Sequence, residues 1–104
     1  MARRSAADTR LHMLKFGCAL EQIADSSLEF ASDARSLADA RSVCERPSRR
    51  GVEMPWLSVR SAARHLSRLE DEGFIVRLGR GRYRVERQRV FDAYEAAEAQ
   101  YLAR

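Results

Sequence analysis

The sequence has little of what several classes of protein require. None of its apolar runs exceeds three residues, so no segment is long enough to span a membrane. Its two cysteines, Cys18 and Cys44, lack the Cys-x-x-Cys or Cys/His spacing of a zinc site. His12 and His65 lie 53 positions apart, and there is no Gly-rich phosphate loop and no nucleophile set beside a base. We therefore expect no catalytic residues, no metal and no cofactor, and we expect that the protein is not an enzyme.

The chain of 104 residues suits a single domain with one core. Residues 1–7 are basic but lead into no apolar region of the secretory kind, which predicts a cytoplasmic protein with a flexible basic tail. We expect one folded domain over residues 8–87 and a separate C-terminal helix over residues 88–104. Both cysteines fall at positions where a helix would bury them, which is typical of small core residues.

Positive charge is concentrated in one part of the chain. Residues 46–89 carry twelve basic and five acidic side chains, a net charge of +7. Residues 1–45 carry −1 and residues 90–104 carry −2. A basic field restricted to one segment favours a polyanionic partner.

The segment 58–86 has the pattern of a helix, a strand, a tight loop and a second strand. Ser58 is a plausible N-cap, and Gly73 follows the last turn, where a left-handed residue commonly ends a helix. Alternating residues after Gly73 predict two strands, and Gly79 and Gly81 are expected to supply the unusual backbone angles of a hairpin loop. The apolar residues of the helix recur at helical spacing: Val59, Ala62, Ala63, Leu66 and Leu69.

The polar side chains of this segment are strongly basic. Three arginines spaced four apart share one side of the helix, and no acidic residue accompanies them before the last turn. The hairpin loop adds two more arginines. The predicted basic surface comprises Arg60, Arg64 and Arg68 on the helix, Ser61 and His65 beside them, and Arg80 and Arg82 in the loop.

This segment resembles the recognition helix and wing of a winged helix-turn-helix domain, as in MarR-type and related bacterial regulators. The matching residues are 64–70 (RHLSRLE), 72–75 (EGFI) and 79–82 (GRGR). The resemblance implies an α+β, mostly helical fold with a two-stranded wing hairpin and a C-terminal helix. It also implies that residues 8–87 form a winged-helix domain that binds double-stranded DNA, with the helix in the major groove and the wing on the flanking backbone or minor groove.

The function that this resemblance implies is a sequence-specific transcriptional regulator, most simply a repressor. Plasmid or phage replication and segregation proteins use the same fold and are an open alternative. A winged-helix module that contacts other proteins is a third interpretation, although the local charge of +7 argues against it. The sequence identifies neither an operator nor a small-molecule effector.

The rest of the chain is expected to supply supporting helices. One is predicted over residues 8–24, where Gly17 indicates close packing with a neighbour, and another lies within residues 28–45. Residues 46–57 form a loop much longer than the turn of about three or four residues that a helix-turn-helix usually has. Arg49 and Arg50 in this loop either bind phosphates or are simply solvated. Trp56 is predicted to anchor the core.

The final helix carries an apolar stripe. Val90, Tyr94, Ala97 and Tyr101 recur at intervals of four, three and four, and Phe91 widens the stripe. This spacing is that of a seam between two helices, and large tyrosines are enriched at interfaces. We therefore expect a homodimer joined through this helix. Packing of the same stripe on the rest of its own chain is the alternative.

Overall fold

The computed structural model describes residues 6–53 and 57–103. Helices dominate, and the described strands form one three-stranded antiparallel sheet, so the expected α+β and mostly helical class is confirmed. The expectations for Trp56 and for residues 1–5 of the basic tail lie outside the described residues. In chain order the elements are α1 (Ala6–Ile23), β1 (Glu29–Ala31), α2 (Ala34–Cys44), α3 (Val59–Asp71), β2 (Ile75–Gly79), β3 (Arg82–Val85) and α4 (Arg87–Leu102).

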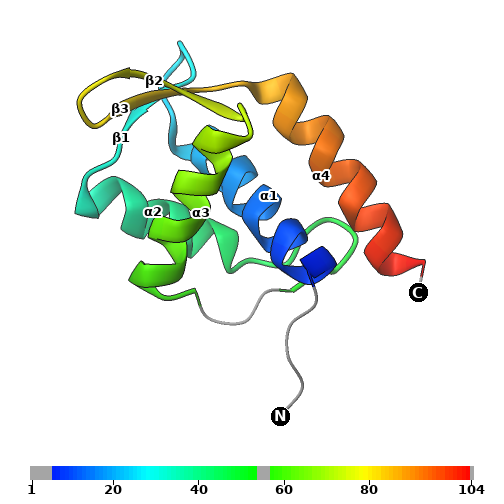
Figure 1. Ribbon diagram of the computed structural model, residues 1–104. Coiled ribbons are helices and arrows are strands. Elements are labelled where there is room, and N and C mark those ends of the chain that lie inside the picture. Colours follow the sequence, from blue (N-terminus) through cyan, green and yellow to red (C-terminus); the bar gives the residue numbers. More distant parts are fainter. Residues whose placement is uncertain (1–5, 54–56, 104) are drawn as a thin grey trace.

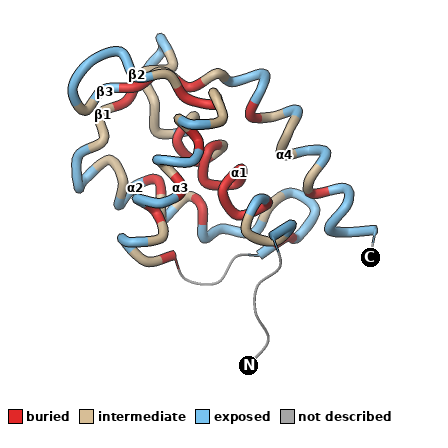
Figure 2. The backbone as a smooth tube through the Cα atoms, in the orientation of Figure 1, coloured by how far each residue is buried: buried red, intermediate tan, exposed pale blue. Residues whose placement is uncertain are grey.

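Helix α1 is the centre of the core. Its side chains from Leu11 to Leu20 are nearly all buried, and Phe16 is fully covered. Figure 2 shows this buried stretch enclosed by the other elements, with exposed backbone mostly at the periphery. α1 packs against α2, α3 and α4, as expected for a helix with a broad apolar face.

Gly17 allows two helices to approach α1 closely. A Cβ at this position would lie 3.2 Å from Leu69 Cδ2 of α3 and 3.2 Å from Val90 Cγ1 of α4. The predicted close packing at Gly17 is therefore confirmed. It brings the middle of α1 within contact distance of the helix that carries the arginine stripe.

The expected two-stranded wing is wrong in its number of strands, because a third strand pairs with the hairpin. β1 pairs with β3, and the strand order is β1-β3-β2. The Phe30 ring of β1 stacks on Tyr83 of β3 at a centroid distance of 5.5 Å. The prediction placed residues 29–31 within a helical segment, but a strand of three residues is too short for its periodicity to be read. Its pairing with β3, more than fifty positions away, stabilises it.

Helix α3 begins and ends where its sequence predicts. The Ser58 hydroxyl oxygen accepts a hydrogen bond from Ser61 N–H at 3.0 Å. At the other end, Gly73 has a φ of +78°, and Phe74 N–H and Gly73 N–H donate to the carbonyls of Leu69 and Glu70. This pair of bonds is the Schellman motif that ends a helix at a left-handed glycine.

The loop between α2 and α3 and the helix α4 complete the molecule. The loop contains a tight turn in which Ser48 N–H donates to Val52 O at 2.9 Å, and Val52 is buried. α4 packs along α1 and places Val90 in the same core, so it belongs to the same packed body as residues 6–53 rather than standing apart. No helix of the described ranges is long and apolar enough to cross a membrane.

Candidate nucleic-acid interface

Helix α3 has one buried and one basic exposed face. Ala62, His65 and Leu69 point into the core and are 5% exposed or less. Arg60, Arg64 and Arg68 are exposed along the other side, at the four-residue spacing that aligns side chains on a helix. The sequence predicts this division, but not for every apolar residue: Val59, which is 66% exposed, and Ala63 were expected on the buried side and lie at the surface.

His65 is a correction to the predicted basic surface. It is 5% exposed, and its ring lies 6.1 Å from the Phe16 ring of α1. It stands three residues after Ala62 and four before Leu69, which is the spacing of the core face. His65 therefore stabilises the position of α3 and is not available to a ligand outside the molecule.

Ser61 also has an internal role. Its N–H and its hydroxyl oxygen both lie 3.0 Å from the Ser58 hydroxyl oxygen, at the helix start. The side chain is half-buried, so the predicted contact by Ser61 would compete with this cap.

The arginines of the exposed face differ in their ionic partners. Among the described residues, Arg60 and Arg64 have no carboxylate within 4 Å. Arg68 has only a distant one, since its Nη2 lies 3.8 Å from Glu72 Oε2. Glu72 also accepts from Arg10 at 2.6 Å. The first two turns of α3 thus present uncompensated positive charge.

The hairpin between β2 and β3 closes in a two-residue turn, Arg80-Gly81. Gly81 has a φ of +70°, and its carbonyl accepts from Ser32 N–H at 2.8 Å, which fixes the turn to the end of β1. Gly79 has no positive φ, so its expected special conformation is wrong. Arg80 is exposed and has no carboxylate partner in the described part of the chain.

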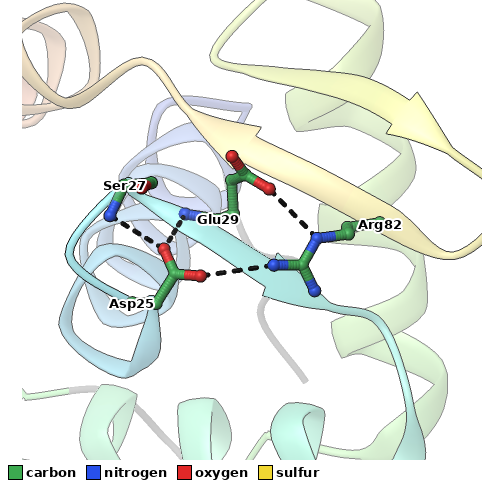
Figure 3. A network of polar contacts seen from close by, with 4 residues as sticks. All are labelled: Asp25, Ser27, Glu29 and Arg82. Atoms are coloured by element: carbon green, nitrogen blue, oxygen red, sulfur yellow. Dashed lines mark hydrogen bonds and ion pairs between the residues drawn. The ribbon is translucent and has the colours of Figure 1, made fainter.

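Arg82 lies in a different environment from Arg80. Its guanidinium donates to Glu29 Oε1 at 3.0 Å and to Asp25 Oδ2 at 3.2 Å (Figure 3). Asp25 is itself held, because its other oxygen accepts from the N–H groups of Ser27 and Glu29. These backbone hydrogen bonds, that from Glu29 foremost, lower the pKa of Asp25, and Arg82 adds to the effect. Arg82 therefore ties β3 to the segment that follows α1.

Sequence reasoning did not find this network. Asp25 and Arg82 are 57 positions apart, and no local spacing links them. The same holds for Arg87, whose Nε lies 3.4 Å from Glu21 Oε1.

Other basic residues of the segment 58–89 are also compensated internally. Arg77 makes two hydrogen bonds of 3.1 Å to Glu70, and these raise the pKa of Arg77 and lower that of Glu70. Arg84 pairs with Glu86 at 3.1 Å. The net charge of +7 is therefore not spread evenly. Exposed arginines without an ionic partner among the described residues are found in the first turns of α3 and at the β2–β3 turn. Arg89, which lies over the Phe74 ring, and Arg46 and Arg49 in the loop before α3 also lack one.

Arg49 and Arg50 lie elsewhere. The loop that carries them borders α4, and Arg50 Nε is 3.7 Å from Glu98 Oε1. In Figure 1, α4 runs along the right of the molecule, whereas the β2–β3 turn lies at the upper left, with α1 between them. The structure does not bring Arg49 and Arg50 together with Arg80.

The predicted dimer stripe of α4 is largely occupied within the chain. Val90 is fully buried, and Phe91, Tyr94 and Ala97 pack against the same core. Tyr101 is 37% exposed and the neighbouring Leu102 46%. Contact with α1 thus covers most of the stripe and leaves its last turn at the surface.

The two cysteine thiols are expected to be unreactive at neutral pH. Burial raises the pKa of Cys18 to about 12 and that of Cys44 to about 11, so both stay protonated at neutral pH, where a thiolate would be needed for reactivity. Among residues 6–53 and 57–103, no three His, Cys, Asp or Glu side chains are grouped as metal ligands would be.

No family model matches this sequence, and no curated protein or solved structure matches it. We therefore infer the candidate interface from the geometry of this chain alone.

Proposed function

We propose that the protein binds double-stranded DNA through α3 and the β2–β3 turn, in a winged helix-turn-helix arrangement. The observation that carries the proposal is the placement of unpaired charge. Arg60, Arg64 and Arg80 are exposed and lack carboxylate partners among the described residues, whereas most neighbouring arginines are compensated. Exposed, unpaired arginine on a helix and on a hairpin is what a phosphate backbone attracts.

The dimensions of α3 suit the major groove. An α-helix with its side chains is about 10–12 Å across, close to the groove width of about 12 Å. Arg60 and Arg64 are about 6 Å apart along the helix axis, which is roughly two base steps. Arginine reads guanine O6 and N7 more often than any other specific contact. We therefore assign Arg60 and Arg64 to base edges, and Arg68, with its distant partner Glu72, to flanking phosphate.

The hairpin turn serves as the wing. Arg80 stands at its tip, and Ser32 holds the Gly81 carbonyl, so the tip is a supported element rather than a loose loop. We assign Arg80 to a phosphate or to the minor groove beside the helix. Arg82 supports the wing through Asp25 and Glu29.

The biological role that we propose is transcriptional regulation, most simply repression. Both a regulator and a replication or segregation protein would need the surface described here. The long segment 45–58 between α2 and α3 departs from a simple helix-turn-helix and leaves the approach angle of α3 to be set by its packing on α1.

The homodimer remains part of the proposal in a narrower form. Because Val90 is buried inside its own chain, the exposed part of the stripe within the described residues is the last turn of α4, where Tyr101 is 37% exposed and the adjacent Leu102 46%. We propose that two copies meet at this turn. A two-fold pair would present two α3 helices to half-sites about 34–36 Å apart.

A fluorescence anisotropy titration tests the proposal. Labelled random-sequence duplex at low salt is titrated with the wild type, with the double variant Arg60→Glu Arg64→Glu, and with Arg35→Glu as a charge-change control on exposed α2. We expect binding by the wild type and the control variant, and a loss of about tenfold or more in the double variant. Equal binding by the double variant, or none by the folded wild type, would refute the proposal.

A further inference from the structure

Two apolar residues lie on the exposed face of α3 beside the unpaired arginines. Val59 is 66% exposed, the highest value among the large apolar residues of the described ranges, and Ala63 is exposed one turn later. An isolated apolar residue at a surface is common and needs no explanation. Val59 and Ala63 are not isolated, because residues four apart lie on one side of a helix. They form a short apolar row along one flank of Arg60 and Arg64.

Neither core packing nor helix stability accounts for this apolar row. Leu57, just before the helix, and Ala62, within its first turns, are buried, whereas Val59 and Ala63 lie outside the packed core. A β-branched residue such as Val59 also has a lower helix propensity than the Ala, Glu or Lys that an exposed helix position favours. The row therefore adds apolar surface at a place where the free chain gains no stability from it.

The chemistry of the exposed face restricts the groups that it can bind. Arg60 and Arg64 carry hydrogen-bond donors and no acceptor, and Val59 and Ala63 offer only apolar groups. In the major groove, guanine presents two acceptors, and thymine presents one acceptor and a C5-methyl group. Adenine and cytosine each present an amino donor, for which a guanidinium has no acceptor. The face thus matches guanine and thymine better than adenine and cytosine.

The spacing along α3 suits contacts at two levels of the groove. Val59 and Arg60 differ by about 1.5 Å along the helix axis, which is less than one base step of about 3.4 Å. With α3 lying along the groove, they reach the same or adjoining base pairs. Ala63 and Arg64 repeat this arrangement about 6 Å further on, or roughly two base steps.

We propose that Val59 and Ala63 determine sequence specificity by contacting thymine C5-methyl groups, next to guanines contacted by Arg60 and Arg64. This inference rests on the proposed DNA binding by α3 and adds a base preference to it. Preferred sites then contain thymine beside guanine at two places about two base pairs apart. Val59 contributes more than Ala63, because its side chain is larger and its stiff χ1 angle loses little freedom on contact.

Replacement of thymine by deoxyuridine tests this inference, because it removes the C5-methyl group and leaves the hydrogen-bonding edge of the base unchanged. Bound duplexes are first selected from a random-sequence library with the wild type, and each thymine of the preferred site is then replaced in turn. Anisotropy titrations at one salt concentration compare the thymine and deoxyuridine duplexes. We expect one replacement to lower the affinity of the wild type about fourfold, the ratio that corresponds to burial of one methyl group.

Two truncation variants identify the residue that contacts this methyl group. Val59→Ala should bind the thymine and deoxyuridine duplexes with affinities within about twofold of each other, because the side chain that contacts the methyl group is shortened. Leu78→Ala shortens another exposed apolar side chain, on β2, and should keep the fourfold difference. Both residues are exposed, so thermal melting should show both variants folded.

The outcomes separate this inference from the DNA binding on which it rests. No binding of any duplex by the folded wild type would refute both. Binding without a preferred sequence, or with equal affinity for thymine and deoxyuridine at every position, would overturn the methyl contacts and leave DNA binding standing. A difference that persists at every position in Val59→Ala, or that is lost in Leu78→Ala, would also overturn the inference, since another residue would then contact the methyl group.

Discussion

Arg80 and Arg82 flank the same glycine, yet the structure gives them different roles that one pair of substitutions can separate. Arg82 makes two ion pairs, with Asp25 and Glu29, and is half exposed. Exposed pairs contribute about 0.2–1 kcal/mol each, so Arg82→Ala should lower the free energy of unfolding by about 1 kcal/mol. For a chain of this size that corresponds to a melting temperature about 4–8 °C lower. Arg80 contacts no carboxylate in the described ranges, so Arg80→Ala should leave the melting temperature unchanged.

For DNA binding we expect the opposite order, with the larger effect from Arg80→Ala. One phosphate contact contributes about 0.9 to the slope of log K against log salt, so a fourfold rise in salt costs about 3.5-fold in affinity per contact. Arg80→Ala should reduce the slope by about 0.9, whereas Arg82→Ala should change it little because its charge is already compensated. The assays are thermal melting and anisotropy titrations with duplex at several salt concentrations. A variant Arg82→Ala with unchanged melting and a reduced slope would refute the assignment of the two arginines.

Three further predictions concern stability and assembly. Gly73→Ala should lower the free energy of unfolding by about 1–2 kcal/mol in urea titrations, because φ at this position is +78°. Gly79 has no positive φ and open space around it, so Gly79→Ala should lower that free energy by less. Equal losses in the two variants would refute the role of the left-handed glycine. The N-cap hydrogen bond from Ser36 N–H lowers the pKa of Asp33, so its stabilisation is present above the ordinary carboxyl pKa of about 3.9 and is lost as pH falls through the lowered value. Asp33→Asn keeps the cap and should make stability less dependent on acid pH in urea titrations at several pH values, whereas an unchanged dependence would contradict the assignment. The homodimer predicts a two-chain mass by light scattering at tens of micromolar and a single-chain mass for Tyr101→Glu Leu102→Glu, and a monomeric wild type would reject it.

The features that the sequence predicted correctly depend on residues close together in the chain. Ser58 and Gly73 mark the ends of α3 because capping and left-handed glycine act over a few residues. Gly17 indicated close packing because a helix interior rarely keeps glycine without a reason. The exposed stripe of Arg60 and Arg64 follows from helical periodicity alone.

The features that the sequence did not predict depend on contacts between distant parts of the chain. β1 exists because β3 pairs with it, and its three residues carry no readable period. His65 was assigned to the basic surface by its charge type, although its spacing from Ala62 and Leu69 places it in the core. The pairing of Arg82 with Asp25 depends on the folded chain and cannot be inferred from either residue's neighbours. Sequence reasoning thus identified the basic helix and hairpin but not which arginines remain unpaired.

The most direct test of the central claim is amide NMR of the labelled protein titrated with duplex DNA. We expect the largest changes in amide chemical shift on residues 59–68 of α3 and on Arg80 and Gly81, with little change in loop 46–50 and α4. Changes confined to loop 46–50 or α4, or no changes at low salt, would contradict the claim that α3 and the β2–β3 turn form the DNA-binding surface.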